Sequence, residues 1–189
     1  MTTSNGSRPI SISRTTSSPS SSPSEVAPLI LGVDPGSRFT GYGLVRPRGG
    51  RIVYERSGVF ATKPTLPFAD RLLAIYEGLT ALLEECHPDE IAVETAFVRK
   101  SPLAALQIGH VRGVILLAAR QSGAQIFEYT APEVKMAVVR QGAAAKEQVA
   151  FMVRRLLPGV GVVREDETDA LAVALCHAHR APGRALRIR

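Results

Sequence analysis

Two short apolar stretches of this sequence each end in a carboxylate. Residues 29–33 (Leu-Ile-Leu-Gly-Val) lead to Asp34, which enters a Pro-Gly turn, and residues 91–93 (Ile-Ala-Val) lead to Glu94. Apolar runs bounded by Gly and Pro predict buried strands. If the two strands are parallel neighbours, both carboxylates lie at one end of the sheet, where open α/β sheets usually bind ligands.

Two further carboxylates, Asp166 and Asp169, are three residues apart at the start of a predicted helix, so they share one face. Acidic residues also favour helix N-termini, and a capping role is the alternative for Asp166, Glu165 and Glu167. Four converging carboxylates without Cys or His select hard cations such as Mg²⁺ or Mn²⁺. Two such ions can hold the attacking and leaving oxygens of a phosphodiester in line, so the pattern predicts metal-dependent phosphoryl transfer.

Three glycines, Gly36, Gly41 and Gly43, follow Asp34. Because they carry no Cβ, we expect a bulky polyanion to approach the backbone closely there. For an isolated Asp-Pro-Gly sequence, the alternative is an ordinary hairpin whose Asp caps its own turn.

The composition suits a single domain of 189 residues with a sizeable core. A net charge of +6 fits a nucleic-acid partner, although a modest excess of Arg is common on solvated surfaces. Cys86 and Cys176 fall in predicted helices, which indicates no disulfide framework and a reducing compartment such as the cytoplasm. No run of eighteen apolar residues exists, so we expect no membrane-spanning segment.

Three parts of the chain differ in composition. Residues 1–28 are rich in Ser, Thr and Pro, and we expect them to form a disordered extension, with a transit peptide as the alternative. Residues 29–180 carry the periodic apolar patterns of a folded domain. The Arg-bearing residues 181–189 read as a basic flexible tail.

Hydrophobic periodicity predicts an α/β fold with a five-stranded mixed sheet flanked by helices: three antiparallel strands, then parallel strands that follow helical crossovers. The helix over 101–122 is apolar most of the way round, so it needs a neighbour beyond the sheet, and a second subunit is the natural candidate. A capping box is expected at Thr130 and Glu133. The strands are expected at 29–33, 41–46, 51–60, 91–93 and 124–129, and the helices at 66–87, 101–122, 130–142, 149–156 and 166–179.

Several blocks together resemble the RuvC family of Holliday-junction resolvases, over Leu29 to His179 and in the family's order. In chain order they are residues 31–38 (LGVDPGSR), 40–43 (TGYG), 93–97 (VETAF), 106–114 (LQIGHVRGV), 127–129 (FEY), 145–149 (AKEQV) and 166–174 (DETDALAVA).

The resemblance implies a ribonuclease-H-like fold and a homodimeric endonuclease that resolves four-way DNA junctions in recombination and repair. Such an enzyme cuts two strands of like polarity with two Mg²⁺ ions per active site, for which Mn²⁺ can substitute, and it works with the RuvA–RuvB branch-migration complex. Its catalytic, metal-binding carboxylates fall on Asp34, Glu94, Asp166 and Asp169.

The resemblance also implies DNA contacts. An aromatic that stacks on an unpaired base falls on Phe97, and a basic pair falls on Lys135 and Lys146, of which Lys146 also steadies charge at the scissile group. The alternative for either lysine is a solvated helix face. Further DNA contacts are expected from Arg38, Arg99 and Lys100.

Two residues depart from the family pattern. Ser101 stands where members often have Asn, and His110 replaces a usual Gln or small residue in the long helix. His110 could alter junction contacts or the subunit interface, or simply be packed.

Three other functions compete with this interpretation. An actin-like ATPase or sugar kinase would need a second, similar half, and this chain is too short and shows no internal repeat. An RNA-processing nuclease of the YqgF type and a non-catalytic junction-binding protein remain the alternatives.

Overall fold

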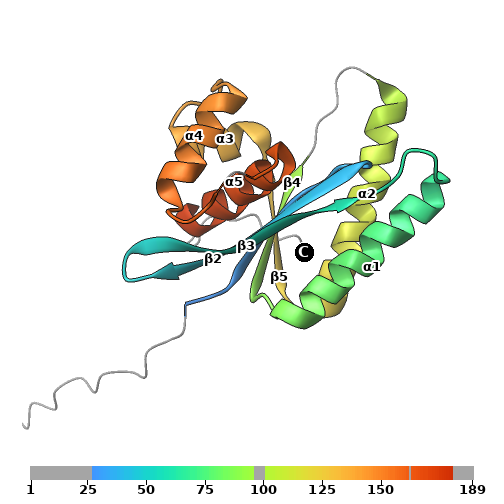
Figure 1. Ribbon diagram of the computed structural model, residues 1–189, viewed down its shortest axis with the longest axis horizontal. Coiled ribbons are helices and arrows are strands. Elements are labelled where there is room, and N and C mark those ends of the chain that lie inside the picture. The colour runs from blue at the N-terminus through green and yellow to red at the C-terminus, as the bar shows by residue number, and fades with distance from the viewer. Residues whose placement is uncertain (1–26, 96–100, 162, 181–189) are drawn as a thin grey trace, which may run out of the picture.

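The computed structural model describes residues 27–95, 101–161 and 163–180 (Figure 1). The elements are β1 (Ile30–Asp34), β2 (Phe39–Arg48), β3 (Arg51–Ala61), α1 (Phe68–Cys86), β4 (Glu90–Thr95), α2 (Pro102–Ser122), β5 (Gln125–Thr130), α3 (Ala131–Val139), α4 (Lys146–Leu156) and α5 (Glu165–Arg180).

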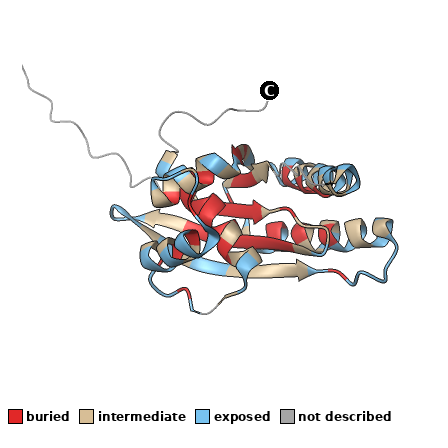
Figure 2. Cartoon of the chain, turned by 90° about the horizontal axis from the view of Figure 1, so that it is seen from above, coloured by how far each residue is buried: buried red, intermediate tan, exposed pale blue. Residues whose placement is uncertain are grey.

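These five strands form one sheet in the order β3-β2-β1-β4-β5. β1, β2 and β3 are antiparallel neighbours, whereas β4 pairs parallel with both β1 and β5. Helices α1 and α2 cover one face of the sheet, and α3, α4 and α5 cover the other (Figure 1). Figure 2 shows the central strands buried along their length and the edge strand partly exposed. The predicted mixed five-stranded sheet is confirmed.

Alternation along β1 decides which face each side chain meets. Ile30 packs in the core beneath α5, while Leu31 and Val33 pack against α1 and α2. Because successive side chains of a strand point to opposite faces, Asp34 lies on the same face as Ile30, the face that α5 covers.

Glycines let α5 lie directly on the sheet. A Cβ on Gly32 would lie 2.2 Å from the backbone oxygen of Ala170, and a Cβ on Gly43 would lie 2.6 Å from Leu171 Cδ2. At Gly41 the nearest atom would be the backbone oxygen of Asp166, at 2.0 Å. The prediction that Gly41 and Gly43 leave room for a polyanion is therefore wrong, because α5 occupies that space.

Gly36 has a similar internal reason. A Cβ there would lie 1.9 Å from the backbone oxygen of Phe39, so this glycine closes the turn after β1 and is not open to a ligand either. The β2–β3 turn is tighter than predicted, because β2 continues through Arg48 and only Gly49 and Gly50 form the turn. Both have positive φ, 55° and 76°, as a two-residue hairpin turn requires.

The helix caps follow their local sequence signals. Thr130 Oγ1 accepts a hydrogen bond from the backbone N–H of Glu133, and the Glu133 carboxylate accepts from the Thr130 N–H, which confirms the predicted capping box. Ser101 caps α2 by accepting from the N–H of Ala104 at 3.3 Å. Ser and Asn are both good N-cap residues, so the departure at Ser101 keeps the cap.

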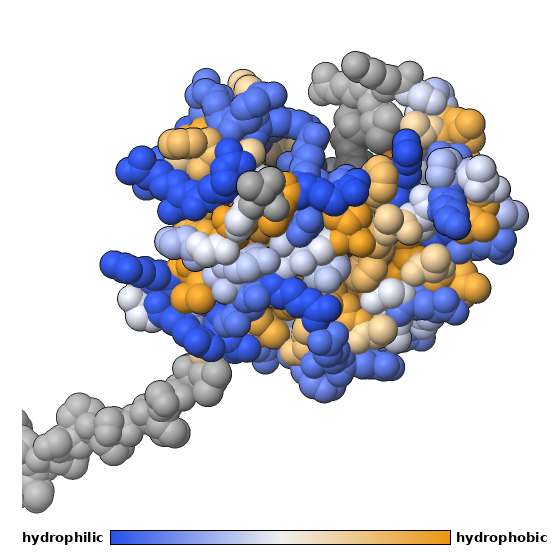
Figure 3. Space-filling view, viewed as in Figure 1, coloured by the Kyte–Doolittle hydropathy of each residue, from blue (hydrophilic) through white to orange (hydrophobic). Residues whose placement is uncertain are grey.

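Helix α2 is buried on one face and exposed on the other. It is long and apolar enough, by length and composition alone, to cross a membrane, a test that core helices also pass. Val111 and Ile115 are fully buried, but Leu106 is 60% exposed and Leu117 is 54% exposed. Figure 3 shows hydrophobic side chains at the surface on the side of α1 and α2. The expected second apolar face of α2 is therefore present and open.

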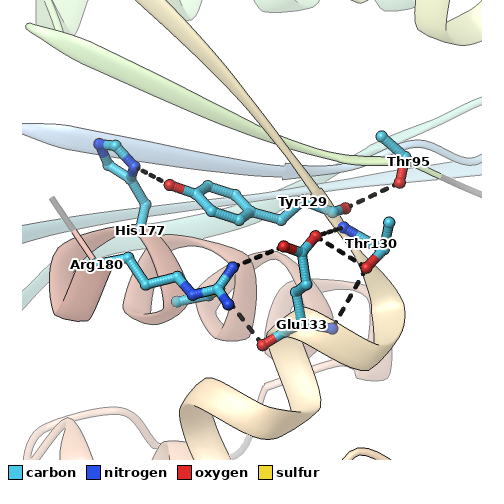
Figure 4. Close-up of polar contacts among 7 residues, drawn as sticks. Thr95, Tyr129, Thr130, Glu133, His177 and Arg180 are labelled. Carbon is cyan, nitrogen blue, oxygen red and sulfur yellow. Dashed lines mark hydrogen bonds and ion pairs between the residues drawn. The ribbon is translucent and has the colours of Figure 1, made fainter. Parts of the chain in front are cut away.

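A buried polar chain ties the second half of α5 to the sheet (Figure 4). His177 is 0% exposed, with Nδ1 2.7 Å from the Tyr129 hydroxyl and Nε2 2.7 Å from a Glu90 carboxylate oxygen. Burial lowers the pKa of His177, so the imidazole is neutral. Since a carboxylate only accepts, Nε2–H donates to Glu90 and Nδ1 accepts from Tyr129.

We expect Gly32→Ala to destabilise the protein. The added methyl group would meet the backbone of α5, which cannot move aside as a flexible side chain can. Overpacking of this kind costs about 1–3 kcal/mol of unfolding free energy, measurable by urea denaturation. Gly161→Ala is the matched control, because a Cβ there meets nothing within 4 Å, and its unfolding midpoint should stay close to wild type. Equal midpoints for the two variants would contradict the close approach.

Candidate metal-binding active site

Asp34 and Glu94 are neighbours at the carboxyl edge of the sheet. β1 and β4 are adjacent and parallel, with Val33 opposite Val93, and each strand continues directly into its carboxylate. Ala92 packs in the core beneath α5, so Glu94, two residues on, points to the same face as Asp34. The predicted meeting of these two strand ends is confirmed.

The first turn of α5 brings the other two carboxylates over the same edge. Gly41 pairs with Asp34 across β1 and β2, and the backbone oxygen of Asp166 lies directly above Gly41. Asp169 follows one helical turn later, on the face of α5 that meets the sheet beside Asp34. The structure thus groups the four carboxylates that the sequence singled out.

The electrostatics of Asp34 report this grouping. Burial raises the pKa of Asp34 to about 8, with further increases from the negative charges of Glu94, Asp169 and Asp166, in that order. Burial also raises the pKa of Glu94, and the charge of Asp169 adds to that shift. Only carboxylates that share one low-dielectric region repel each other in this way.

Lys146, at the start of α4, reaches the same cluster. Its Nζ lies 2.5 Å from Glu165 Oε1 and 3.2 Å from Asp169 Oδ2. The bond to Glu165 raises the pKa of the Lys146 ammonium, which stays charged. The ammonium opposes the pKa increase of Asp34 as well, so Lys146 is part of the site and not merely on a solvated helix face.

The four carboxylates are chemically suited to a hard cation, but their side chains do not surround a common point. Within residues 27–95, 101–161 and 163–180, no group of three or more His, Cys, Asp or Glu side chains stands close enough to hold a metal ion as the side chains lie. Lys146 engages Asp169, and mutual repulsion favours a protonated Asp34. A divalent cation would relieve this repulsion, and carboxylate oxygens are the ligands that Mg²⁺ and Mn²⁺ prefer.

The acidic neighbours in α5 have separate roles. Glu167 accepts hydrogen bonds from Ser57 Oγ at 2.7 Å and from the backbone N–H of Arg164 at 3.2 Å, so the capping interpretation holds for Glu167. Glu165 instead pairs with Lys146. Asp166 lies inside the first turn of α5 and pairs with Arg164 at 3.7 Å.

The predicted DNA-contacting residues lie partly at this site. Lys135 is near enough to Glu94 to lower the pKa of that carboxyl, against the dominant effect of burial. Arg38 is exposed in the turn after β1, with its guanidinium 5.1 Å from the centre of the Phe39 ring. Three of the predicted contacts lie outside the described residues: Phe97, Arg99 and Lys100.

The sequence did not predict that a second arginine, Arg164, contacts the Phe39 ring. The guanidinium of Arg164 lies 4.3 Å from the centre of the Phe39 ring, so Arg38 and Arg164 both contact one aromatic at the rim of the carboxylate cluster. Nothing in the local sequence signals this contact, because the two arginines are separated by 126 positions and meet only when α5 docks on the sheet.

Known proteins resemble this chain over most of its length. The family model described as "Crossover junction endodeoxyribonuclease RuvC" matches residues 30–177. A protein of that name from Syntrophotalea carbinolica is 50% identical over 150 residues, which span 79% of this chain and 93% of that protein. One from Acidiphilium cryptum is 49% identical over 150 residues, 79% of this chain and 90% of that protein.

A solved structure also resembles the fold of this chain. It is described as T. thermophilus RuvC in complex with Holliday junction substrate, and it is 33% identical, with a TM-score of 0.79. The match covers 85% of this chain and 99% of that chain.

Without metal, Asp34→Asn should raise the thermal stability of the protein at pH 8. The pKa of Asp34 is about 8 in the folded state against 3.8, its ordinary value, when unfolded. Between these values the folded state holds a proton that the unfolded state has released, so wild-type stability falls as pH rises. The loss is on the order of a few kcal/mol by pH 8, since each pKa unit corresponds to about 1.4 kcal/mol.

Thermal unfolding in chelator at pH 4, 6 and 8 measures this effect. The difference between Asp34→Asn and wild type should become small near pH 4, because the unfolded carboxyl, with its ordinary pKa of 3.8, then holds about half a proton and the folded one a full proton. Asp70→Asn, which changes an aspartate in the first turn of α1, is the matched control and should gain no such pH-dependent advantage. A stability gain at Asp34 that is constant with pH would contradict the raised pKa.

Proposed function

The chain belongs to the RuvC family of crossover junction endodeoxyribonucleases, and we propose that it resolves Holliday junctions by hydrolysing one phosphodiester in each of two strands of like polarity. The observation that carries the proposal is the grouping of Asp34, Glu94, Asp166 and Asp169 at one edge of the sheet, with the pKa of Asp34 raised to about 8. Such a cluster is costly for stability and useful for binding cations.

Nucleases of this family are metal-dependent. In the proposed site the four carboxylates would hold Mg²⁺, two ions per active site, and Mn²⁺ could substitute. When bound, these ions supply charge stabilisation for the attacking and leaving oxygens. Asp34 and Glu94 form the floor of the site from β1 and β4, and Asp166 and Asp169 close it from α5. The Lys146 ammonium, 3.2 Å from Asp169, would stabilise negative charge on the scissile phosphate.

The proposed substrate contacts surround this site. Lys135, Arg38, Arg99 and Lys100 would hold backbone phosphates, which makes binding salt-sensitive, and Phe97 would stack on an unpaired base. Phosphate contacts carry no sequence information by themselves, so junction shape would supply most of the selectivity.

A homodimer fits both the substrate and the open face of α2. A four-way junction has near-twofold symmetry, and a twofold protein presents two identical sites to it. A shallow apolar groove runs along α2, and a Cβ on Gly109 or Gly113 would meet nothing within 4 Å, so a second helix can approach closely. The groove is lined by Leu72, Ala105, Leu106, Gly109, His110, Gly113, Val114 and Leu117.

His110 is exposed in this groove, with Nδ1 2.8 Å from the backbone oxygen of Leu106 and the ring edge-on to Phe68 at 5.8 Å. The interpretation of His110 as a simply packed residue is wrong, and its position favours a role at the subunit interface. By family membership the proposed partner is the RuvA–RuvB branch-migration complex, and the proposed compartment is the cytoplasm.

Asp34→Asn should abolish Mg²⁺-dependent cleavage of a synthetic four-way junction and leave junction binding within about threefold of wild type. The substitution keeps the shape of the side chain but removes a negatively charged ligand from the centre of the cluster. Cleavage is read on denaturing gels and binding by fluorescence anisotropy without metal. Asp70→Asn serves again as the matched control and should cut normally.

The same assay separates the alternatives. A structured RNA in place of the junction tests the RNA-processing nuclease, which should prefer it. Binding without cutting by the wild-type chain, in Mg²⁺ or Mn²⁺, would point to a non-catalytic junction-binding protein and refute the proposal.

Leu106→Lys should convert the dimer to a monomer at micromolar concentration, because it places a charge in the apolar groove of α2. Sedimentation velocity measures the change. Phe151→Lys is the matched control: Phe151 is comparably exposed, at 57%, but lies on α4 against the opposite face of the sheet. Loss of the dimer in both variants, or in neither, would argue against α2 as the interface.

A further inference from the structure

Lys146 is bonded to two carboxylates that differ in their roles. Asp169 belongs to the proposed metal-binding cluster and is only 24% exposed, whereas Glu165 is 68% exposed at the rim. The ammonium lies closer to Glu165, at 2.5 Å, than to Asp169, at 3.2 Å. If Asp169 binds a metal ion, the Lys146 ammonium can therefore keep its ion pair with Glu165.

An ammonium group and a divalent cation that share the Asp169 carboxylate carry like charges and repel each other. Lys146 therefore competes with the metal for Asp169, and anything that draws its Nζ outward makes metal binding easier. Glu165 can draw the ammonium outward, because it lies one helical turn before Asp169 in α5 and faces α4. The two carboxylates hold the ammonium between them.

There is room for Lys146 to move. A cavity of about 290 Å³ lies between α4 and α5 beside the two carboxylates, and its lining includes the Lys146 side chain, Ala150, Val163 and Thr168. A lysine stem can shift its position within this space while its Nζ stays bonded to Glu165.

We infer that Glu165 is a positioning residue for Lys146: it holds the ammonium at the rim of the site, which frees Asp169 for the metal and keeps the positive charge beside the scissile phosphate. This inference rests on the proposed function and adds a residue to the same site. Glu165 acts through Lys146 and is not itself a metal ligand.

A double-mutant cycle on the full chain tests the inference by a direct readout, Mn²⁺ binding measured by calorimetry. Glu165→Gln should raise the dissociation constant of Mn²⁺ about three- to fivefold, because Lys146 then has Asp169 as its one charged partner. In the Lys146→Met background the same substitution should change the dissociation constant little, since no ammonium remains to be positioned.

Glu147→Gln is the matched control in both backgrounds. Glu147 lines the same cavity and carries the same charge. Its substitution therefore measures how much the loss of a nearby negative charge by itself weakens Mn²⁺ binding. Equal weakening by Glu165→Gln in both backgrounds, beyond the control, would show that Glu165 acts as a charge and not through Lys146. No weakening in the presence of Lys146 would equally overturn the inference.

The result is separable from the proposed function. A wild-type chain that binds Mn²⁺ but cuts neither DNA junctions nor RNA refutes the nuclease activity, while the binding cycle still decides the role of Glu165. A wild-type chain that binds no Mn²⁺ overturns both.

Discussion

The geometry of the site depends on how closely α5 lies against the backbone of β1 and β2. Gly32, Gly41 and Gly43 place no side chain of the sheet beneath the helix. Backbone atoms of α5 lie against Gly32 and Gly41, and the Leu171 side chain lies against Gly43. A helix held one side chain further away would carry Asp166 and Asp169 out of reach of Asp34. The glycines therefore bring acidic side chains from distant parts of the chain into one cluster, and they do so through packing and not through contact with a ligand.

The same contact creates an electrostatic cost. Bringing carboxylates together in a partly buried place raises their pKa values, and Asp34 shows the largest effect. Lys146 relieves only part of the repulsion, because it is exposed and shared with Glu165. A divalent cation bound as proposed would offset the remainder, so metal affinity and a lower stability without metal would have one cause.

The carboxylate cluster and the apolar groove of α2 lie on opposite faces of the sheet. On the α5 face, the neutral His177 bonds to Tyr129 (Figure 4) and to Glu90, and these bonds anchor the second half of the helix, so that its first turn is held over the strand ends. On the other face, α2 buries Val111 and Ile115 against the fold and leaves an apolar groove open to a partner. The carboxylate cluster and the groove proposed for the dimer interface thus lie on opposite faces of the sheet, so changes in the groove need not disturb the carboxylates.

Local patterns in the sequence were enough to place the elements. Apolar runs and the capping box at Thr130 act over a few neighbouring positions, and the structure has each of them where the pattern puts it. The turn between β2 and β3 lies within the gap left between the two predicted strands, but it is shorter, since only Gly49 and Gly50 form it. The candidate carboxylates were also visible, because each stands at the end of a strand or the start of a helix.

Only the tertiary structure decided why the glycines are there, which acidic residues cap and which bind Lys146, and that Arg164 meets Arg38 on one ring. These features depend on the distance and angle at which α5 docks on the sheet. Periodicity tells which face of an element is apolar, but it does not tell how near two faces come, and that distance determines whether carboxylates far apart in sequence share one cation.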